Sequence, residues 1–162
     1  MPAPSQPAEQ ARPGSERLRQ STMAILAEAK AAEFVGAEAA LGPLPSFRHL
    51  RRPEMGLLMV KGRIGGEGAS FNLGEATVTR CLIVTEAGTE GAAYHLGRDL
   101  VKAEKAALFE ALAREALWRE RIETALLAPV KARLAVERGA KTAATAATRV
   151  EFFTMVRGED QK

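Results

Sequence analysis

The chain has 162 residues, of which 46% are hydrophobic and 27% charged, and its net charge is +3. This length and composition predict one soluble globular domain with its own core. No run of about 18 apolar residues that could span a membrane is present, and the first residues lack the apolar core of a secretory signal. A single cysteine, Cys81, cannot form an internal disulfide, which favours a reducing, cytoplasmic location.

The positive charge is scattered along the chain and clusters only at Arg48, Arg51 and Arg52. Aromatic residues make up 5% of the sequence, which is too few for a platform that stacks nucleic-acid bases. Nucleic-acid binding is therefore not expected. The arginines are better suited to carboxylate or phosphate groups, because a planar guanidinium binds either with two parallel hydrogen bonds.

The amino-terminal part is expected to contain a disordered leader followed by two helices. Residues 1–15 are rich in proline, serine and glutamine, a composition typical of disorder. Residues 16–29 carry apolar side chains at helical spacing on one side, which predicts an amphipathic helix. A second helix is expected over residues 31–41, because Gly42 and Pro43 form a stop signal directly after it.

The middle of the chain changes to a strand pattern. We expect strands at Ser46–Arg52 and Leu57–Arg63, separated by a turn at Pro53–Gly56. Residues 76–85 alternate and are rich in threonine and valine, which predicts a third strand, and residues 91–96 are expected to form a fourth. Because the connections are short, neighbouring strands should be antiparallel.

From Asp99 onward the pattern becomes helical again, with Asp99 as the expected N-cap. Apolar residues then recur at helical spacing as far as Leu134, and Pro129 among them requires a kink or a fresh helix start near Ala128. Gly139 is expected to close this part. The order of elements predicts an α+β fold: amino-terminal helices, a four-stranded, mainly antiparallel sheet, and carboxy-terminal helices packed on one face.

The chain end is unusually apolar, so we divide the sequence into a single domain at residues 16–147 and an extended docking tail at residues 148–162. Chain ends are normally polar, and burying each large apolar side chain stabilises a structure by about 1.5–3 kcal/mol. The tail could complete its own sheet as an edge strand, or clamp into a groove of a partner. We favour the clamp, because phenylalanine and arginine are enriched at interfaces. The interface candidates are Arg149, Phe152, Phe153, Met155 and Arg157.

Residues 63–74, RIGGEGASFNLG, could cradle a phosphate through exposed backbone N–H groups. The segment lacks the ending of a P-loop and no helix clearly follows it, so a flexible loop or bulge between strands is the favoured interpretation. Arg98, where a strand meets a helix, could bind a phosphate or a partner carboxylate, or simply form an ion pair. Arg80 could be a ligand or interface residue, or lie on a solvated face. The candidate ligand-binding residues are Arg63, Gly65, Gly66, Gly68, Arg80 and Arg98.

No catalytic arrangement is visible in the sequence. His49 and His95 have no other ligand residue at metal-site spacing, so no metal site is expected, and the two could meet only if the first and fourth strands were neighbours. Cys81 lies in an apolar strand, where an inert buried thiol is expected. A nucleophile with a base and an orienting acid is not apparent. Catalytic residues therefore stay unassigned, and no cofactor is expected on this chain alone.

Four sequence blocks, in this order and spacing, resemble the PhnG family, the small subunit of the bacterial carbon–phosphorus lyase system. The resemblance spans about residues 17–160. The residues that carry it are Arg63, Gly65, Gly66, Gly68, Phe71, Gly74, Ala76, Thr77, Thr79 and Arg80, then Gly97, Arg98, Asp99, Ala103 and Glu104, then Leu127, Ala128 and Pro129, and finally residues 149–158.

The resemblance implies membership of a cytoplasmic complex with PhnH, PhnI and PhnJ, with PhnL associated. With PhnH, PhnI and PhnL, such a subunit takes part in forming α-D-ribose 1-methylphosphonate 5-triphosphate from ATP and methylphosphonate, with release of adenine. ATP is then a substrate of the complex. We expect a scaffold or activating subunit that is inactive alone. The alternatives are an independent enzyme that binds a phosphorylated substrate through Arg80, Arg98 and the glycine loop, or a pure interaction module.

Overall fold

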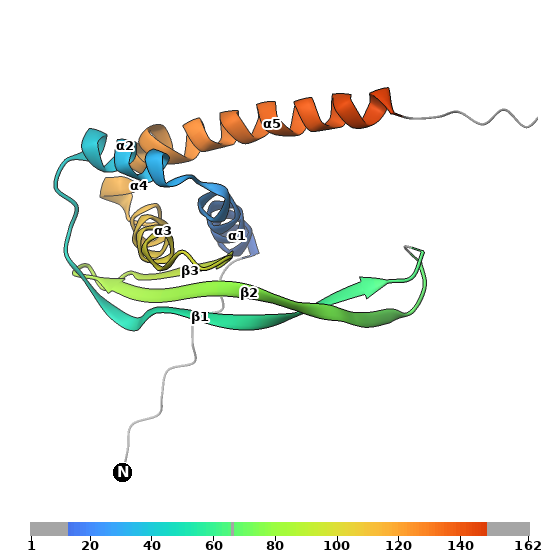
Figure 1. The fold of residues 1–162 in the computed structure, drawn as a ribbon. Helices are drawn as coiled ribbons and strands as arrows, with labels where there is room; N and C mark the ends of the chain where they lie inside the picture. Colours follow the sequence, from blue (N-terminus) through green and yellow to red (C-terminus); the bar gives the residue numbers. More distant parts are fainter. Residues whose placement is uncertain (1–12, 66, 149–162) are drawn as a thin grey trace, which may run out of the picture. The chain divides into compact units, whose positions relative to one another are not determined.

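The structure is a computed structural model that describes residues 13–65 and 67–148 (Figure 1). The chain divides into two compact units, Met1–Lys131 and Ala132–Lys162, and the first contains the whole sheet. The observed class is α+β, as predicted. The elements in chain order are α1 (Pro13–Glu28), α2 (Ala31–Leu41), β1 (Phe47–Arg63), β2 (Ser70–Thr85), β3 (Glu90–Leu96), α3 (Leu100–Leu112), α4 (Ala116–Ile122), the π-helical turn η1 (Glu123–Leu127) and α5 (Ala128–Ala147).

The described residues form a three-stranded antiparallel sheet in the order β1-β2-β3, so the expectation of four strands was wrong. The turn expected at Pro53–Gly56 does not form, and the two strands predicted around it are one continuous strand, β1. The pairing of β1 with β2 shifts register between Arg51 and Glu54. A bulge on an edge strand accommodates Pro53, which has no N–H to give to a ladder.

Strand β2 begins at Ser70, six residues before the predicted start, and takes in residues 70–74 of the glycine-rich segment. Arg63 pairs with Ser70, so the loop at the end of the hairpin is restricted to residues 64–69. A further register shift lies between Val60 and Lys61, where the opposite strand carries Gly74 with a φ of 158°. The predicted last strand is confirmed as β3.

Helices α1 and α3 lie against one face of the sheet (Figure 1). The start of α3 is the predicted one, because the Asp99 carboxylate accepts the Lys102 N–H at 2.9 Å. The buried side of α3 contains several alanines, which let the helix come very close to β3. A Cβ added to Gly91 would overlap the carbonyl oxygen of Ala107. The buried alanines of α3 are Ala103, Ala106, Ala107 and Ala111.

A kink or a fresh helix start was expected near Ala128, and the helix type changes there, because the π-helical turn η1 ends at Leu127 and α5 begins at Ala128. Pro129 therefore occupies the first turn of α5, where its missing N–H is tolerated. The expectation that Gly139 closes the helical part was wrong, since α5 continues to Ala147. A glycine inside a helix costs only about 1 kcal/mol relative to alanine, and the surrounding residues are mostly good helix formers.

Candidate functional site

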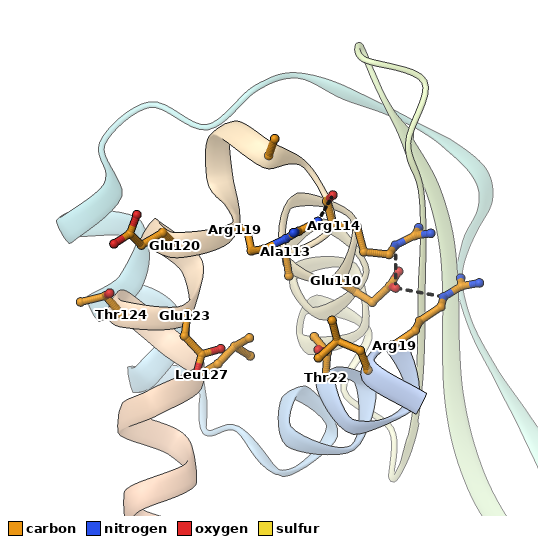
Figure 2. Close-up of a pocket in the computed structure, with 12 residues that line it drawn as sticks. Arg19, Thr22, Glu110, Ala113, Arg114, Arg119, Glu120, Glu123, Thr124 and Leu127 are labelled. Carbon is orange, nitrogen blue, oxygen red and sulfur yellow. Dashed lines mark hydrogen bonds and ion pairs between the residues drawn. The ribbon is translucent and has the colours of Figure 1, made fainter. Parts of the chain in front are cut away.

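A cavity of about 830 Å³ lies in the first unit, between α1, α3, α4 and η1 (Figure 2). The elements that surround it come from both ends of that unit, so the fold and not the local sequence creates the cavity. The polar residues that line it are Arg19, Thr22, Glu110, Arg114, Arg119, Glu120, Glu123 and Thr124.

Glu110 organises one side of this cavity. Its side chain is fully buried, and one carboxylate oxygen accepts the Nε–H of Arg19 at 3.0 Å and forms an ion pair with Nε of Arg114 at 3.1 Å. The other oxygen accepts the backbone N–H of Ala92 at 3.0 Å. The carboxylate thus joins α1, α3 and β3 at a single point. Two hydrogen bonds and two ion pairs satisfy the requirement that a buried charge be paired and hydrogen-bonded.

The two guanidinium groups beside Glu110 lie close together, because both contact the same oxygen atom. Each uses its Nε and retains terminal amino groups, and the side chains of Arg19 and Arg114 are 39% and 36% exposed. One carboxylate balances one of the two positive charges, so the cluster keeps a net positive charge. Figure 2 places both guanidinium groups at the same side of the cavity. Such an arrangement can bind a phosphate or carboxylate group at the rim of the cavity.

Arg80, predicted as a ligand or interface residue, lies on the exposed face of β2. Its Nε donates to Glu54 at 2.7 Å, and the same carboxylate oxygen accepts from Arg51 at 2.8 Å. The hydrogen bond from Arg51, followed by that from Arg80, lowers the pKa of Glu54 below its usual value. The Arg80 guanidinium is therefore already engaged within the chain, in a surface network.

Arg63 and the glycines lie at the far end of the hairpin. The Arg63 guanidinium donates to the carbonyl oxygen of Gly68 at 3.4 Å, and the N–H of Gly68 donates to Ile64 at 2.9 Å. Gly65 has a φ of 59°, in the left-handed region that favours glycine. Gly66 lies outside the described residues. The geometry of a tight turn therefore explains Gly65 and Gly68, which agrees with the interpretation of this segment as a loop between strands.

Those predicted ligand residues that the structure describes do not meet in one place. Arg80 lies ten residues along β2 from Ser70, the partner of Arg63, which corresponds to about 33 Å of extended strand. Arg98 lies in the connection between β3 and α3, is exposed, and forms no ion pair with any described residue. None of the three lines the cavity described above. A single site made of the glycine loop, Arg80 and Arg98 is therefore not formed by the described part of the chain.

The histidines and the cysteine also occupy separate positions. His49 on β1 contacts Glu104 of α3 at 2.8 Å, whereas His95 is buried on β3, and β2 lies between the two strands. Burial, followed by the charge of Lys102, lowers the pKa of His95. Cys81 is buried as predicted, and burial raises the pKa of its thiol to about 11. Within residues 13–65 and 67–148, no three His, Cys, Asp or Glu side chains form a group suited to a metal ion.

Sequence reasoning missed the Glu110 cluster altogether. Arg19 and Arg114 are distant in sequence and meet only through the packing of α1 on α3. One signal was present: Glu110 interrupts the otherwise apolar run from Ala106 to Leu112. An acid on the apolar side of a helix must find partners or lose its charge.

Among the described helices, none combines the length and apolar character that a membrane crossing requires. The fold is thus an α+β domain with a cavity lined by three arginines and three glutamates. A family model described as "Phosphonate metabolism protein PhnG" matches residues 17–158. A relative from Rhizobium meliloti (strain 1021), named alpha-D-ribose 1-methylphosphonate 5-triphosphate synthase subunit PhnG, is 47% identical over 142 residues, which cover 88% of this chain and 90% of the relative. The chain belongs to the PhnG family, and the resemblance seen in its sequence blocks is confirmed.

Proposed function

We propose that this chain is a subunit of α-D-ribose 1-methylphosphonate 5-triphosphate synthase and acts in the breakdown of organophosphonates. The observation that carries the proposal is the 47% identity, over nearly the full length of both chains, to a relative named as that subunit. The complex would transfer the ribose triphosphate of ATP to methylphosphonate and release adenine, which is a transferase reaction.

The proposed partners are PhnI, PhnH and PhnJ, with PhnL associated, in the cytoplasm. Within that complex the chain would act as a scaffold and activating subunit of the nucleosidase-like PhnI, without turnover of its own. The chemistry of the described residues supports this role. The Cys81 thiol is buried with a raised pKa, and the side chain of His49 is held by Glu104. Neither is placed to attack a substrate.

We further propose that arginines of this chain help to hold phosphate groups at a site that another subunit completes. Arg98 is the best placed of the predicted residues, because it is exposed and forms no ion pair with a described residue. Arg19 and Arg114 form a positive cluster around Glu110, and their terminal amino groups are not used in the contact with that carboxylate. Since Arg63 and Arg80 already have intrachain partners, they are weaker candidates than Arg98 for direct ligand contact.

The test is reconstitution with co-expressed PhnH, PhnI and PhnL. Adenine release from ATP in the presence of methylphosphonate should depend on this chain, and the isolated chain should release none. Unchanged adenine release without the chain would overturn the proposed function. Adenine release by the isolated chain would overturn the scaffold role and favour an independent enzyme.

Single substitutions by alanine then separate ligand contact from assembly. Lost turnover with intact assembly, for Arg63→Ala, Arg80→Ala or Arg98→Ala, would support contact with the substrate, whereas lost assembly would support a pure interaction module. Arg138→Ala is a matched control, because Arg138 is an exposed arginine on α5. It should change neither quantity.

The proposed clamp lies outside the described residues and stays a prediction. Deletion of residues 148–162 removes Arg149, Phe152, Phe153, Met155 and Arg157 together. This deletion should abolish co-purification with PhnI. Full co-purification of the shortened chain would show that the tail is dispensable for assembly.

A further inference from the structure

The hairpin of β1 and β2 extends well past the rest of the sheet. These strands have 17 and 16 residues, whereas β3 has 7 and pairs with β2 only between Val78 and Val84. Residues 55–77, here called the arm, are therefore mostly a two-stranded ribbon. Figure 1 shows this ribbon continuing beyond α1 and α3. No described residue of the arm is buried.

The arm is nevertheless strongly apolar. Seven of the 17 large hydrophobic side chains that are exposed in the described residues belong to it. Exposed apolar side chains concentrated in one segment indicate an interaction site, whereas single exposed apolar residues need no explanation. The seven residues are Met55, Leu57, Leu58, Met59, Ile64, Phe71 and Leu73, and they are 42–70% exposed.

Both faces of the arm carry these side chains. Strand alternation and the pairing of Leu57 with Thr77 place Leu57 on the face that continues the helix-covered side of the sheet. Leu58, paired with Ala76, lies on the opposite face. Phe71 shares that opposite face, and its ring lies over Gly62, where an added Cβ would be 3.3 Å from the ring. A ribbon that is apolar on both faces fits a cleft better than a flat surface.

The edges of the arm are open as well. The edge of β1 that faces away from β2 has no neighbouring strand among the described residues. The same is true, between Ser70 and Thr77, of the edge of β2 that faces away from β1. Two-stranded ribbons are marginally stable in water, and open edges offer N–H and C=O groups to an added strand. The arm therefore needs a neighbour that supplies apolar contact and backbone hydrogen bonds.

The base of the arm is basic. Arg52, three residues before the arm on β1, is exposed and forms no ion pair with any described residue, and Arg51 shares the carboxylate of Glu54 with Arg80. A partner with acidic residues at the mouth of its cleft would match this charge. A second copy of this chain would bring the same positive charges, so charge complementarity favours a different protein.

We propose that the arm inserts into an apolar cleft, with acidic residues around its mouth, in another subunit of the synthase. This inference rests on the proposed function, which supplies the other subunits. Apolar contact on both faces gives the affinity, open edges allow strand pairing, and the arginines at the base orient the approach.

The test compares two double variants in the co-expressed complex. Leu57→Ser with Leu73→Ser removes side chains that are 65% and 66% exposed on the arm. Val101→Ser with Leu117→Ser removes side chains that are 66% and 76% exposed elsewhere, as a matched control. Thermal unfolding of each isolated variant checks the fold, which exposed positions should leave intact. The affinity for the remaining subunits should fall at least about tenfold per arm substitution and stay within about twofold for the control.

Amide hydrogen exchange gives a second, mutation-free readout. Residues 55–77 should exchange at least about tenfold more slowly in the complex than in the isolated chain. Unchanged affinity of the arm variant, together with unprotected arm amides, would overturn the inference. The proposed function would survive that result if the wild-type chain still supported adenine release. If the arm substitutions disrupted a homodimer of this chain and left its assembly into the complex unaffected, the inference would be overturned, and the occupant of the arm would be a second copy of the chain.

Discussion

Replacement of Glu110 by alanine should destabilise the first unit by about 2–4 kcal/mol. The Ala92 N–H would lose its acceptor, and an unsatisfied buried donor costs about 1–3 kcal/mol. Loss of the buried methylene contacts adds about 1 kcal/mol. Arg19 and Arg114 add little, because side chains that are 39% and 36% exposed can turn to water. Breaking a fully buried pair costs about 3–5 kcal/mol, which is therefore an upper limit here.

Urea unfolding followed by far-UV circular dichroism measures this effect as a lower midpoint at unchanged slope. Glu123→Ala is the matched control, because Glu123 lines the same cavity but its ion pair with Lys131 is 46% and 48% exposed. It should cost less than about 1 kcal/mol. Glu110→Gln should fall between the two, since an amide presents a donor to one of its former partners. A Glu110→Ala variant within about 0.5 kcal/mol of wild type would refute the assigned role of the carboxylate.

Three further predictions concern buried positions. Burial lowers the pKa of His95 below its usual value of 6.5, so the unfolded chain binds the proton first as the pH falls. The free energy of unfolding should therefore decrease below about pH 6.5. In urea unfolding at several pH values, His95→Phe should remove the part of this pH dependence that His95 causes. With a thiol pKa of about 11 instead of 9.0, native Cys81 should react with iodoacetamide at least about a hundredfold more slowly than in urea, and equal rates would contradict its burial. Gly91→Ala should destabilise the fold by about 3 kcal/mol or more, because the new methyl group meets the backbone of α3. Gly56→Ala should cost much less, because a Cβ at Gly56 would have no atom within 4 Å. Equal melting temperatures of the two variants would contradict the close packing of α3 on β3.

Local signals predicted the helices and the last strand well. The N-cap at Asp99 and the stop after Leu41 depend on neighbouring residues alone, so they can be recognised in the sequence. Pro53 and Gly56 are equally local signals, and they misled. The pairing of β1 with β2 continues through them, and that pairing is a non-local interaction which no window of sequence contains.

The same distinction explains the candidate site. Family membership could be inferred because its motifs are short and contiguous, whereas the Glu110 cluster joins three elements that are far apart in the chain. Arg80 and Arg98 were correctly placed on a strand and at a strand–helix junction, yet their partners could not be predicted. Whether a surface arginine is paired depends on which strand lies beside it, as Glu54 lies beside Arg80.

The buried alanines of α3 set the distance between this helix and the sheet. Ala107 and Ala111 lie against Gly91, while Glu110, on the same helix, reaches the N–H of Ala92. A bulkier residue at either alanine would lift the helix and pull that carboxylate away from the strand. Tolerance to substitution on this side of α3 should therefore be set by side-chain volume more than by polarity, and one extra methyl group could loosen α1 through its link to Glu110.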